Sequence, residues 1–236
     1  MCTRFVYRGE DVITGFNFDI DLAAWDHEVI LDSERFYIGI LRPDGRRHGY
    51  HGVNRNGNAG TLLYVHGNPA GACRGGPGDV TVAELTERFI CAELDFDAAL
   101  NIVRTGRVTY APDATMQSVL SDAGGRTLII EPGIGYRVER GRCALMTNYS
   151  LLDAESTRPY IVPGDDRYER ARALLDGYGP DFTVRDALDV LYSVRQTGEW
   201  ATRVSFVYSV REGAVYYVLN NGFGRVEKHA FGRCGT

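Results

Sequence analysis

The chain has 236 residues, of which 44% are hydrophobic and 24% are charged, a composition typical of globular proteins. Its net charge of −5 argues against broad electrostatic binding to nucleic acid or to an anionic membrane surface. The length suits one large domain, which we expect to span residues 1–236.

The N-terminal segment has no basic stretch followed by an apolar run, and no apolar run approaches the length of a membrane span. We therefore expect a cytoplasmic protein. The cysteines are odd in number, widely spaced and without a Cys-x-x-Cys pair, which argues against a disulfide framework and a zinc ribbon. They are Cys2, Cys73, Cys91, Cys143 and Cys234, and all except Cys2 are expected to pack as small apolar side chains.

Alternating residues with high β-propensity predict strands in the first part of the chain, at 3–8, 12–18, 28–31, 36–41, 49–53 and 61–65. The turn Gly9-Glu10-Asp11 joins the first two strands into a hairpin. Cys2 then begins an edge of a sheet, and Asp19 can lie near it because a hairpin brings its two ends together. A long Gly- and Pro-rich loop follows at 67–79.

Helices are predicted after this loop, the first with Thr81 and Glu84 as a capping box and the second over 96–103. Strands follow at 115–120, 127–131, 136–139 and 143–147, then helices over 165–175 and 183–194, and a closing meander at 203–210, 215–219 and 225–231. Strands and helices do not alternate regularly. This order predicts an α+β fold, with antiparallel sheet and helices packed outside it.

Cys2 directly follows the initiator methionine, whose removal is expected because the cysteine side chain is small. Cys2 would then carry a nucleophile, its thiol, together with a base, its free α-amine. The reference pKa values are about 8.5 for a cysteine thiol and about 7.7–8.0 for an α-amine. An amine in this range suits proton transfer near neutral pH, and a nearby base generates the reactive thiolate. An ordinary cysteine at this position is the alternative interpretation.

Three further polar residues stand where a strand ends or a helix begins, so their side chains can converge on Cys2. Asp19 ends the second strand, Asn148 follows the strand over 143–147, and Arg167 lies at the start of the helix over 165–175. Each also has an ordinary interpretation, as a strand-end cap, a turn residue and a solvated helix charge.

Two of these assignments have neighbouring alternatives: Asp21 competes with Asp19, and Arg170 with Arg167.

Taken in chain order, the short motifs around Cys2, Asp19, Asn148 and Arg167 resemble those of the choloylglycine hydrolase family. This family includes bile salt hydrolases, penicillin V acylases and related linear-amide hydrolases with an N-terminal nucleophile. Met1-Cys2-Thr3 looks like the N-terminus of the family, and Asn17-Phe18-Asp19 is similar to its Asn-x-Asp segment. The order and placement of the motifs agree over nearly the whole chain.

The remaining motifs of the resemblance lie further along. Asn54-Arg55-Asn56-Gly57 looks like the Asn-x-x-Gly turn of the family, and counting onward from it places Tyr64 at a family oxyanion position. Thr147-Asn148 resembles the Thr-Asn motif, and Asp166-Arg167-Tyr168 resembles a Ser-Arg-Phe-like segment.

The resemblance implies a four-layer αββα sandwich of two mostly antiparallel sheets flanked by helices, and a role for each residue. The Cys2 thiol attacks an amide carbonyl and its α-amine handles the proton, while Asp19 holds and tunes that amine. The Asn148 side chain and the Tyr64 backbone N–H bind the oxyanion, and the charge of Arg167 lowers the pKa of the thiol. An acyl-thioester forms, the amine leaves, and water completes the turnover.

Two departures from the family stand out. Many members carry an arginine immediately before the Asn-x-Asp segment, where this chain has Phe16, so Arg167 would have to stabilise the thiolate alone. The chain is also shorter than the bile salt hydrolases, and the segment between Leu63 and Asn148 is compressed, so loops that shape the family's substrate pocket are expected to be missing.

The resemblance thus predicts hydrolysis of a linear amide, with a small-molecule acyl-amide substrate and no cofactor. Bile salts, penicillin V, acyl-homoserine lactones and small amidated amines are all candidate substrates. Aromatic residues near the site suggest an apolar acyl pocket: Phe16, Phe18, Trp25 and Tyr64. An acyltransferase on the same scaffold and a catalytically silent binding protein are the alternatives, and the oligomeric state, a homo-oligomer included, is left open.

The histidines His48, His51 and His66 invite a metal interpretation. They lie in a Gly-rich context without an adjacent carboxylate or cysteine pattern, and zinc ligands are usually more tightly spaced. We therefore expect loop or pocket-rim histidines and no metal site.

Overall fold

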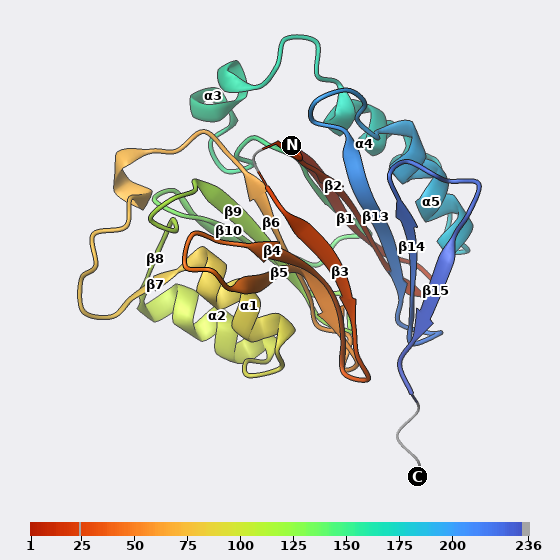
Figure 1. Cartoon of the computed structure of the whole chain (residues 1–236), viewed down its shortest axis with the longest axis horizontal. Coiled ribbons are helices and arrows are strands. Elements are labelled where there is room, and N and C mark those ends of the chain that lie inside the picture. The colour runs from red at the N-terminus through yellow and green to blue at the C-terminus, as the bar shows by residue number, and fades with distance from the viewer. Residues whose placement is uncertain (24, 233–236) are drawn as a thin grey trace.

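The computed structural model describes residues 1–23 and 25–232, and within them two antiparallel sheets face each other (Figure 1). One sheet is six-stranded. In sheet order its strands are β12 (Cys143–Met146), β1 (Cys2–Arg8), β2 (Val12–Asp19), β13 (Thr202–Ser209), β14 (Ala214–Leu219) and β15 (Glu227–Ala230).

The second sheet is seven-stranded. In sheet order it contains β11 (Gly135–Glu139), β10 (Thr127–Glu131), β9 (Met116–Ser121), β6 (Ala59–Tyr64), β5 (Arg47–Asn54), β4 (Arg35–Leu41) and β3 (His27–Leu31). A short parallel pair, which the sequence did not predict, is formed by β7 (Asp79–Thr81) and β8 (Arg107–Thr109).

Helices cover the outer face of each sheet, as Figure 1 shows. The seven-stranded sheet carries α1 (Val82–Ile90) and α2 (Phe96–Thr105), and the six-stranded sheet carries α4 (Arg167–Gly177) and α5 (Val184–Ser193). The short α3 (Ala154–Thr157) and the 3₁₀ turns η1 (Pro69–Gly71) and η2 (Arg158–Tyr160) lie in the connections.

The predicted N-cap of α1 forms, but only one of the two hydrogen bonds of the predicted Thr81–Glu84 capping box is present. The Thr81 hydroxyl accepts a hydrogen bond from Glu84 N and so caps α1. The capping box with bonds in both directions is at α5, where the Thr183 hydroxyl and the Asp186 carboxylate each bind the other residue's backbone N–H.

Three hydrophobic clusters fill the spaces between these layers. The central cluster lies between the sheets and includes Phe16, Phe36 and Phe206. A second packs the six-stranded sheet on α4 and α5, and a third packs the seven-stranded sheet on α1 and α2. The predicted four-layer αββα architecture is therefore confirmed.

The predicted edge position of Cys2 is wrong. Strand β1 lies between β2 and β12, with Cys2 opposite Phe18 and Arg4 opposite Met146. The β2 partner is local and was predicted, whereas β12 begins more than a hundred residues later in the chain. Turn chemistry reports only the local pairing, so the sequence could not show the second neighbour.

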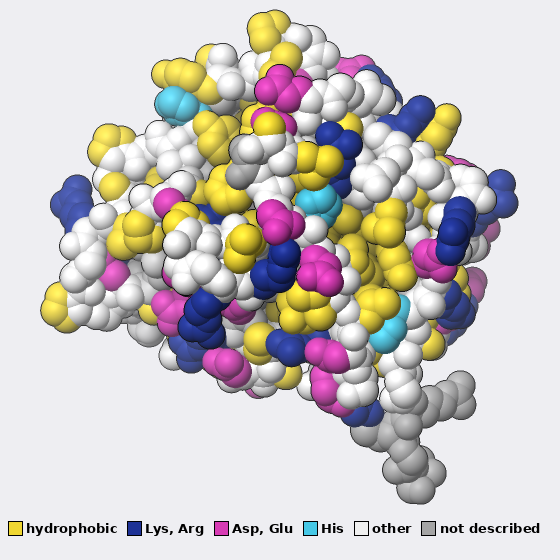
Figure 2. All heavy atoms as spheres, viewed as in Figure 1, with side chains coloured by type: hydrophobic (Ala, Val, Ile, Leu, Met, Phe, Trp, Pro, Cys, Tyr) yellow, Lys and Arg dark blue, Asp and Glu magenta, His cyan; other side chains and the backbone are white. Residues whose placement is uncertain are grey.

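The face shown in Figure 2 carries charges of both signs, and the described cysteines are free thiols. On the face shown in Figure 2, basic and acidic side chains are interspersed. None of the described helices has the length and apolar character needed to cross a membrane. Cys2 is buried as a free thiol, and Cys73, Cys91 and Cys143 are half-buried free thiols rather than fully packed core residues. The prediction for Cys234 lies outside the described residues.

Candidate active site

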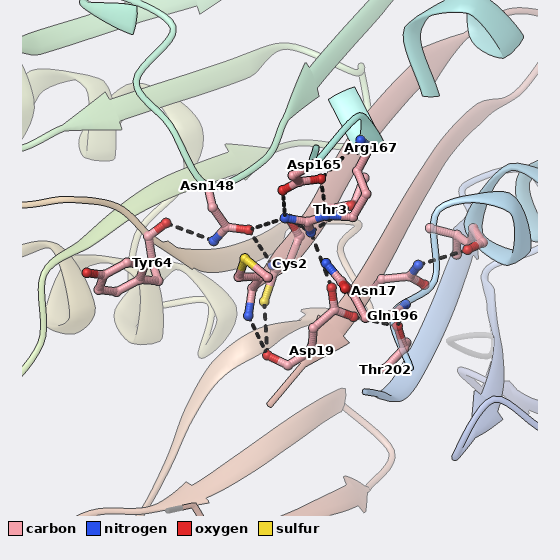
Figure 3. Close-up of polar contacts among 12 residues, drawn as sticks. Cys2, Thr3, Asn17, Asp19, Tyr64, Asn148, Asp165, Arg167, Gln196 and Thr202 are labelled. Atoms are coloured by element: carbon pink, nitrogen blue, oxygen red, sulfur yellow. Dashed lines mark hydrogen bonds and ion pairs between the residues drawn. The ribbon is translucent and has the colours of Figure 1, made fainter. Parts of the chain in front are cut away.

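The strand order of the six-stranded sheet brings the predicted polar residues together. Cys2 begins β1, Asp19 ends the antiparallel neighbour β2, and Asn148 follows β12 on the other side. Antiparallel neighbours place the end of one strand beside the start of the next. Arg167, the first residue of α4, covers the same end of the sheet, and Figure 3 shows these side chains converging around Cys2.

Cys2 is buried, with its side chain on the face of β1 that looks into the space between the sheets. Its backbone nitrogen donates to Asn148 Oδ1 at 2.7 Å, and its Sγ lies 4.0 Å from the backbone oxygen of Asp19. Burial raises the pKa of the Cys2 thiol, and the chain's terminal ammonium and Arg167 oppose this rise. The thiol of the full chain is therefore protonated at neutral pH.

The side chain of Asp19 is fully enclosed. Successive side chains of a strand lie on opposite faces of the sheet, so Asp19 lies on the helix-covered face and Phe18 on the face toward the other sheet. Its Oδ1 accepts from the Thr202 hydroxyl at 2.5 Å, and its Oδ2 accepts from Arg167 Nη1 at 3.3 Å. Burial raises the pKa of Asp19 to about 7, against the lowering effects of the terminal ammonium, Arg167 and Thr202. The ammonium of Met1 itself donates to the backbone oxygen of Asp19, at 2.9 Å.

Arg167 links the groups around Cys2 without touching the thiol. Its side chain is only 5% exposed and donates to Cys2 O at 3.0 Å and to Asn148 Oδ1 at 3.1 Å. Asp165 holds the guanidinium from behind through two bonds, Nε to Oδ1 at 2.9 Å and Nη2 to Oδ2 at 2.7 Å. Such a planar two-point contact fixes the orientation of a guanidinium. Arg167 can therefore act on the thiol only through charge and backbone placement.

The amide orientation of Asn148 follows from its partners. Its Oδ1 accepts from two obligate donors, Cys2 N and Arg167 Nη2, so its Nδ2 points to the other side and donates to Tyr64 O at 2.8 Å. Figure 3 shows Asn148 between Tyr64 and Arg167. An amide nitrogen carries two hydrogens, so one Nδ2–H is left for a further acceptor.

Tyr64 meets Asn148 through its backbone oxygen, and the residue, on the pocket wall, is 48% exposed. Its neighbour Val65 donates to Thr115 O, so in an antiparallel ladder the polar backbone groups of Tyr64 point away from β9. Within a strand, the N–H and C=O of one residue point to the same side. The Tyr64 N–H therefore faces the side on which its C=O binds Asn148.

Three supporting residues were missed by the sequence analysis: Asp165, Thr202 and Gln117. Gln117 is fully buried, and its Nε2 donates to Thr147 O at 2.9 Å and Tyr149 O at 3.1 Å, so it holds the backbone on both sides of Asn148. Only Asp165 gave a usable signal, as an acidic residue two positions before Arg167 at a helix start. Thr202 meets Asp19 through the pairing of β2 with β13, which joins distant parts of the chain.

The alternatives considered from the sequence lie elsewhere. Asp21 is a turn residue whose Oδ1 accepts from Ala23 N. The side chain of Arg170 is 46% exposed and pairs with Asp166 one turn earlier in α4. Phe16 is fully buried in the central cluster, where it is the cross-strand partner of Arg4.

The histidines occupy three separate environments. His48 lies between the carboxylates of Glu87 and Asp44, His66 stacks on Tyr160, and His51 is buried in the central core. Within residues 1–23 and 25–232, no group of three or more His, Cys, Asp or Glu side chains could hold a metal ion.

A pocket of about 1120 Å³ opens beside Cys2 and Asn148. Aromatic and aliphatic side chains form much of its wall, among them Phe18, Trp25, Ile40, Tyr110, Met116 and Trp200. The guanidinium of Arg42 is also there, stacked on Trp25 at 4.8 Å from the ring centroid and paired with Asp113. A mostly apolar lining with a few polar groups is typical of small-molecule pockets, whose volumes are usually about 300–1,000 Å³.

Solved structures with the same architecture include amide hydrolases. A mutant of the conjugated bile acid hydrolase from Clostridium perfringens has a TM-score of 0.66 at 13% identity, over 98% of this chain and 92% of that chain. The penicillin V acylase from Agrobacterium tumefaciens has a TM-score of 0.61 at 17% identity, over 92% of this chain and 83% of that chain.

The Caenorhabditis elegans ortholog of N-acylethanolamine-hydrolyzing acid amidase has a TM-score of 0.57 at 14% identity, over 87% of this chain and 92% of that chain. The chain has the fold of N-terminal-nucleophile amide hydrolases. The resemblance seen in the sequence is thus confirmed at the level of the fold. No protein-family model and no curated protein sequence matches the chain.

In this chain the fold places the buried Cys2 and the amide of Asn148 beside an apolar pocket, with Arg167 enclosed at the start of helix α4. The pocket-facing thiol and the helix-facing Asp19 lie on opposite sides of the same sheet end. Asn148 belongs both to the groups that can meet a substrate and to the groups that hold the backbone of Cys2, because it holds the backbone nitrogen of Cys2 and also lines the pocket.

Proposed function

We propose that this protein hydrolyses the linear C–N bond of a small-molecule N-acyl amide, with Cys2 as an N-terminal nucleophile and an acyl-thioester as the intermediate. One observation carries the proposal. The nitrogen of Cys2 is held by Asn148 at 2.7 Å while its thiol faces a large apolar pocket. A nucleophile and a base from one residue are thereby presented at a site that fits an acyl group.

The proposed active form begins at Cys2. In the full chain the Cys2 nitrogen belongs to a peptide bond and cannot accept a proton. Removal of the preceding residue converts it to an α-amine, whose pKa of about 7.7–8.0 in solution suits proton transfer near neutral pH. This amine takes the thiol proton, and burial then favours reaction of the thiolate because it is poorly solvated.

Each chemical step balances within this set of groups. The thiolate attacks the amide carbonyl carbon, a C–S bond forms, and the carbonyl electron pair moves onto oxygen. Collapse of this intermediate breaks the C–N bond, and the ammonium of Cys2 donates its proton to the leaving amine. Water then attacks the thioester carbonyl carbon while the α-amine accepts a proton from it, and a C–O bond forms. Collapse of this second intermediate breaks the C–S bond, the ammonium returns its proton to the thiolate, and a carboxylic acid and the free thiol are released.

The proposed oxyanion site consists of the free Nδ2–H of Asn148 and the backbone N–H of Tyr64. The amide nitrogen of Asn148 binds Tyr64 O from one side of β6, and the Tyr64 N–H points to that same side. Preorganised donors of this kind stabilise the tetrahedral intermediate, and losing one typically costs about 10²–10³ in rate. Arg167 is a positioning residue in this scheme, because it holds Cys2 O and Asn148 Oδ1.

The test combines intact mass, alkylation and turnover. The purified protein should be short by one methionine residue, and brief treatment with an alkylating reagent should label Cys2 before other thiols. A Cys73→Ser variant is the matched control, since Cys73 is half-buried in the same pocket wall and should not affect Cys2 labelling.

Turnover is then measured as amine release from N-acyl anilides of increasing acyl length. Cys2→Ser should lose most activity and Cys73→Ser should keep it. A protein that retains the residue before Cys2, or a Cys2→Ala variant with full turnover, would contradict the proposal. Products formed with added acceptor amines distinguish hydrolysis from acyl transfer.

A further inference from the structure

His51 is held rigidly in the core beside the nucleophile. It lies on β5, is only 3% exposed, and stacks on Phe16 with ring centroids 5.1 Å apart and planes 16° apart. It also contacts Phe18 in a tilted arrangement, with ring centroids 5.0 Å apart. Phe18 is the cross-strand partner of Cys2, so one side chain separates the imidazole from the nucleophile's strand.

The hydrogen bonds of His51 fix its tautomer. Its Nδ1 lies 3.2 Å from the backbone nitrogen of Leu62, which can only donate, so Nδ1 accepts and the ring proton is on Nε2. Burial lowers the pKa of His51 to about 3. The ring is therefore neutral at working pH and presents a donor, rather than a positive charge.

The Nε2–H is available to a ligand. Among the residues that the structure describes, Nε2 has no hydrogen-bond partner. The atom is also partly accessible from outside, because it is not among the fully buried unpaired polar atoms. His51 forms part of the pocket wall together with Cys2 and Phe18. The small exposed fraction of this side chain thus includes a donor that opens onto the pocket, in surroundings that are otherwise largely apolar.

We propose that the Nε2–H of His51 donates a hydrogen bond to an oxygen carried within the acyl group of the substrate. The substrate class is then N-acyl amides whose otherwise apolar acyl group bears an ether or keto oxygen. This inference rests on the proposed amide-hydrolase function and specifies its substrate.

The physical reason is that a hydrocarbon acyl chain would cover the Nε2–H without satisfying it. A buried polar group left unpaired in a complex is unfavourable, so the site discriminates against ligands that lack the acceptor. A neutral oxygen fits better than a carboxylate. A carboxylate would lose its hydration in an apolar region where His51, held neutral by burial, offers no compensating charge.

Binding is measured separately from turnover, with the Cys2→Ala variant and calorimetry. The ligands are straight-chain N-acyl amides of one length and analogues in which a single ether oxygen replaces each methylene in turn. The best-placed ether should bind about 2- to 12-fold more tightly than the all-carbon chain, the range expected for one neutral hydrogen bond. The preference should fall to about 1 in Cys2→Ala/His51→Phe, where a ring still packs against Phe16 and Phe18.

A matched control is His66→Phe, which makes the same change at a histidine of the same pocket that stacks on Tyr160. It should keep the ether preference. A readout that needs no His51 variant is the ring-proton NMR signal of ¹⁵N-histidine-labelled Cys2→Ala protein. The Nε2–H resonance of His51 should shift downfield with the ether ligand and not with its all-carbon analogue.

The inference is overturned if no ether position is preferred, or if the preference survives in His51→Phe. These outcomes are distinct from failure of the proposed function. Ether-dependent binding without turnover by the unmodified protein would refute amide hydrolysis and leave the role of His51 standing. Turnover with no preference for an oxygen in the acyl group would support amide hydrolysis and refute the role of His51.

Discussion

Replacement of Arg167 by methionine should destabilise the protein strongly. The guanidinium is the shared cation of two enclosed carboxylates, Asp19 at 3.3 Å and Asp165 at 2.7 Å. It also satisfies Cys2 O and Asn148 Oδ1. Methionine has a similar length and fills much of the space but offers no hydrogen-bond donor.

The magnitude follows from what is left behind. Removing one partner of a buried ion pair costs about 3–5 kcal/mol, because the remaining charge has neither water nor a counter-ion. Two carboxylates lose their partner here, but each can protonate, which limits the loss. We therefore expect the free energy of unfolding to fall by about 3–5 kcal/mol for Arg167→Met at pH 8. The loss should be smaller at pH 5.5, where protonation of the orphaned Asp19 is easier.

The assay is urea unfolding followed by circular dichroism, and Arg170→Met is the control. Arg170 lies in the same helix, but its ion pair with Asp166 is exposed, with side-chain exposures of 46% and 58%. Its replacement should change the free energy of unfolding by less than about 0.5 kcal/mol. A loss below about 1 kcal/mol for Arg167→Met, or equal losses for both variants, would refute the role of Arg167 as the buried cation of the site.

Three further predictions concern neighbouring residues. Phe16→Arg introduces the family residue and places a second cation opposite the fully buried Arg4, so it should lower the free energy of unfolding by about 3 kcal/mol or more. Phe16→Leu should cost less, and calorimetric melting of both variants checks this. Gln117→Leu should lower kcat more than it changes KM, because it releases the backbone on both sides of Asn148, and it should lower the free energy of unfolding by about 1–3 kcal/mol. Gln196→Leu is the control, because the hydrogen bonds of Gln196 use its backbone. In the full chain, the pKa of Asp19 is about 7 in the folded state and about 3.9 in the unfolded state. Between these pH values the folded state binds one more proton than the unfolded state. The free energy of unfolding therefore falls as pH rises through this window, by up to about 1.4 kcal/mol per pH unit. Asp19→Asn should remove this slope in urea titrations from pH 4 to 7, and an unchanged slope would rule out Asp19 as its source.

Much of the fold was predictable because its elements are encoded locally. The turn at Gly9-Glu10-Asp11 predicted the β1–β2 hairpin, and the helix predicted over 183–194 begins as α5 at Val184. The strand ends also predicted that Asp19 and Asn148 would approach Cys2, and the structure brings them together. Alternation, capping and turn chemistry each depend on a few adjacent residues, so a single sequence contains them in full.

The contacts within the site were decided by pairings between distant segments. The resemblance implied that the charge of Arg167 lowers the pKa of the Cys2 thiol, and the charge acts in that direction. What the sequence did not show is that the guanidinium contacts the carbonyl oxygen of Cys2 and is anchored by Asp165. Thr202 reaches Asp19 only because β13 pairs with β2, where the register shifts between Thr202 and Val204.

The sequence by itself determined the strands, the main helices and the residue types available at one end of a sheet. The tertiary structure decided which atoms meet there and how strongly they hold protons. His51 shows the reason most directly. Nothing in its neighbours along the chain distinguishes it from His48. Burial against two phenylalanine rings keeps His51 neutral, whereas His48 lies between two carboxylates. Desolvation and hydrogen bonding depend on the atoms that surround a group in space, and strands far apart in the chain supply those atoms.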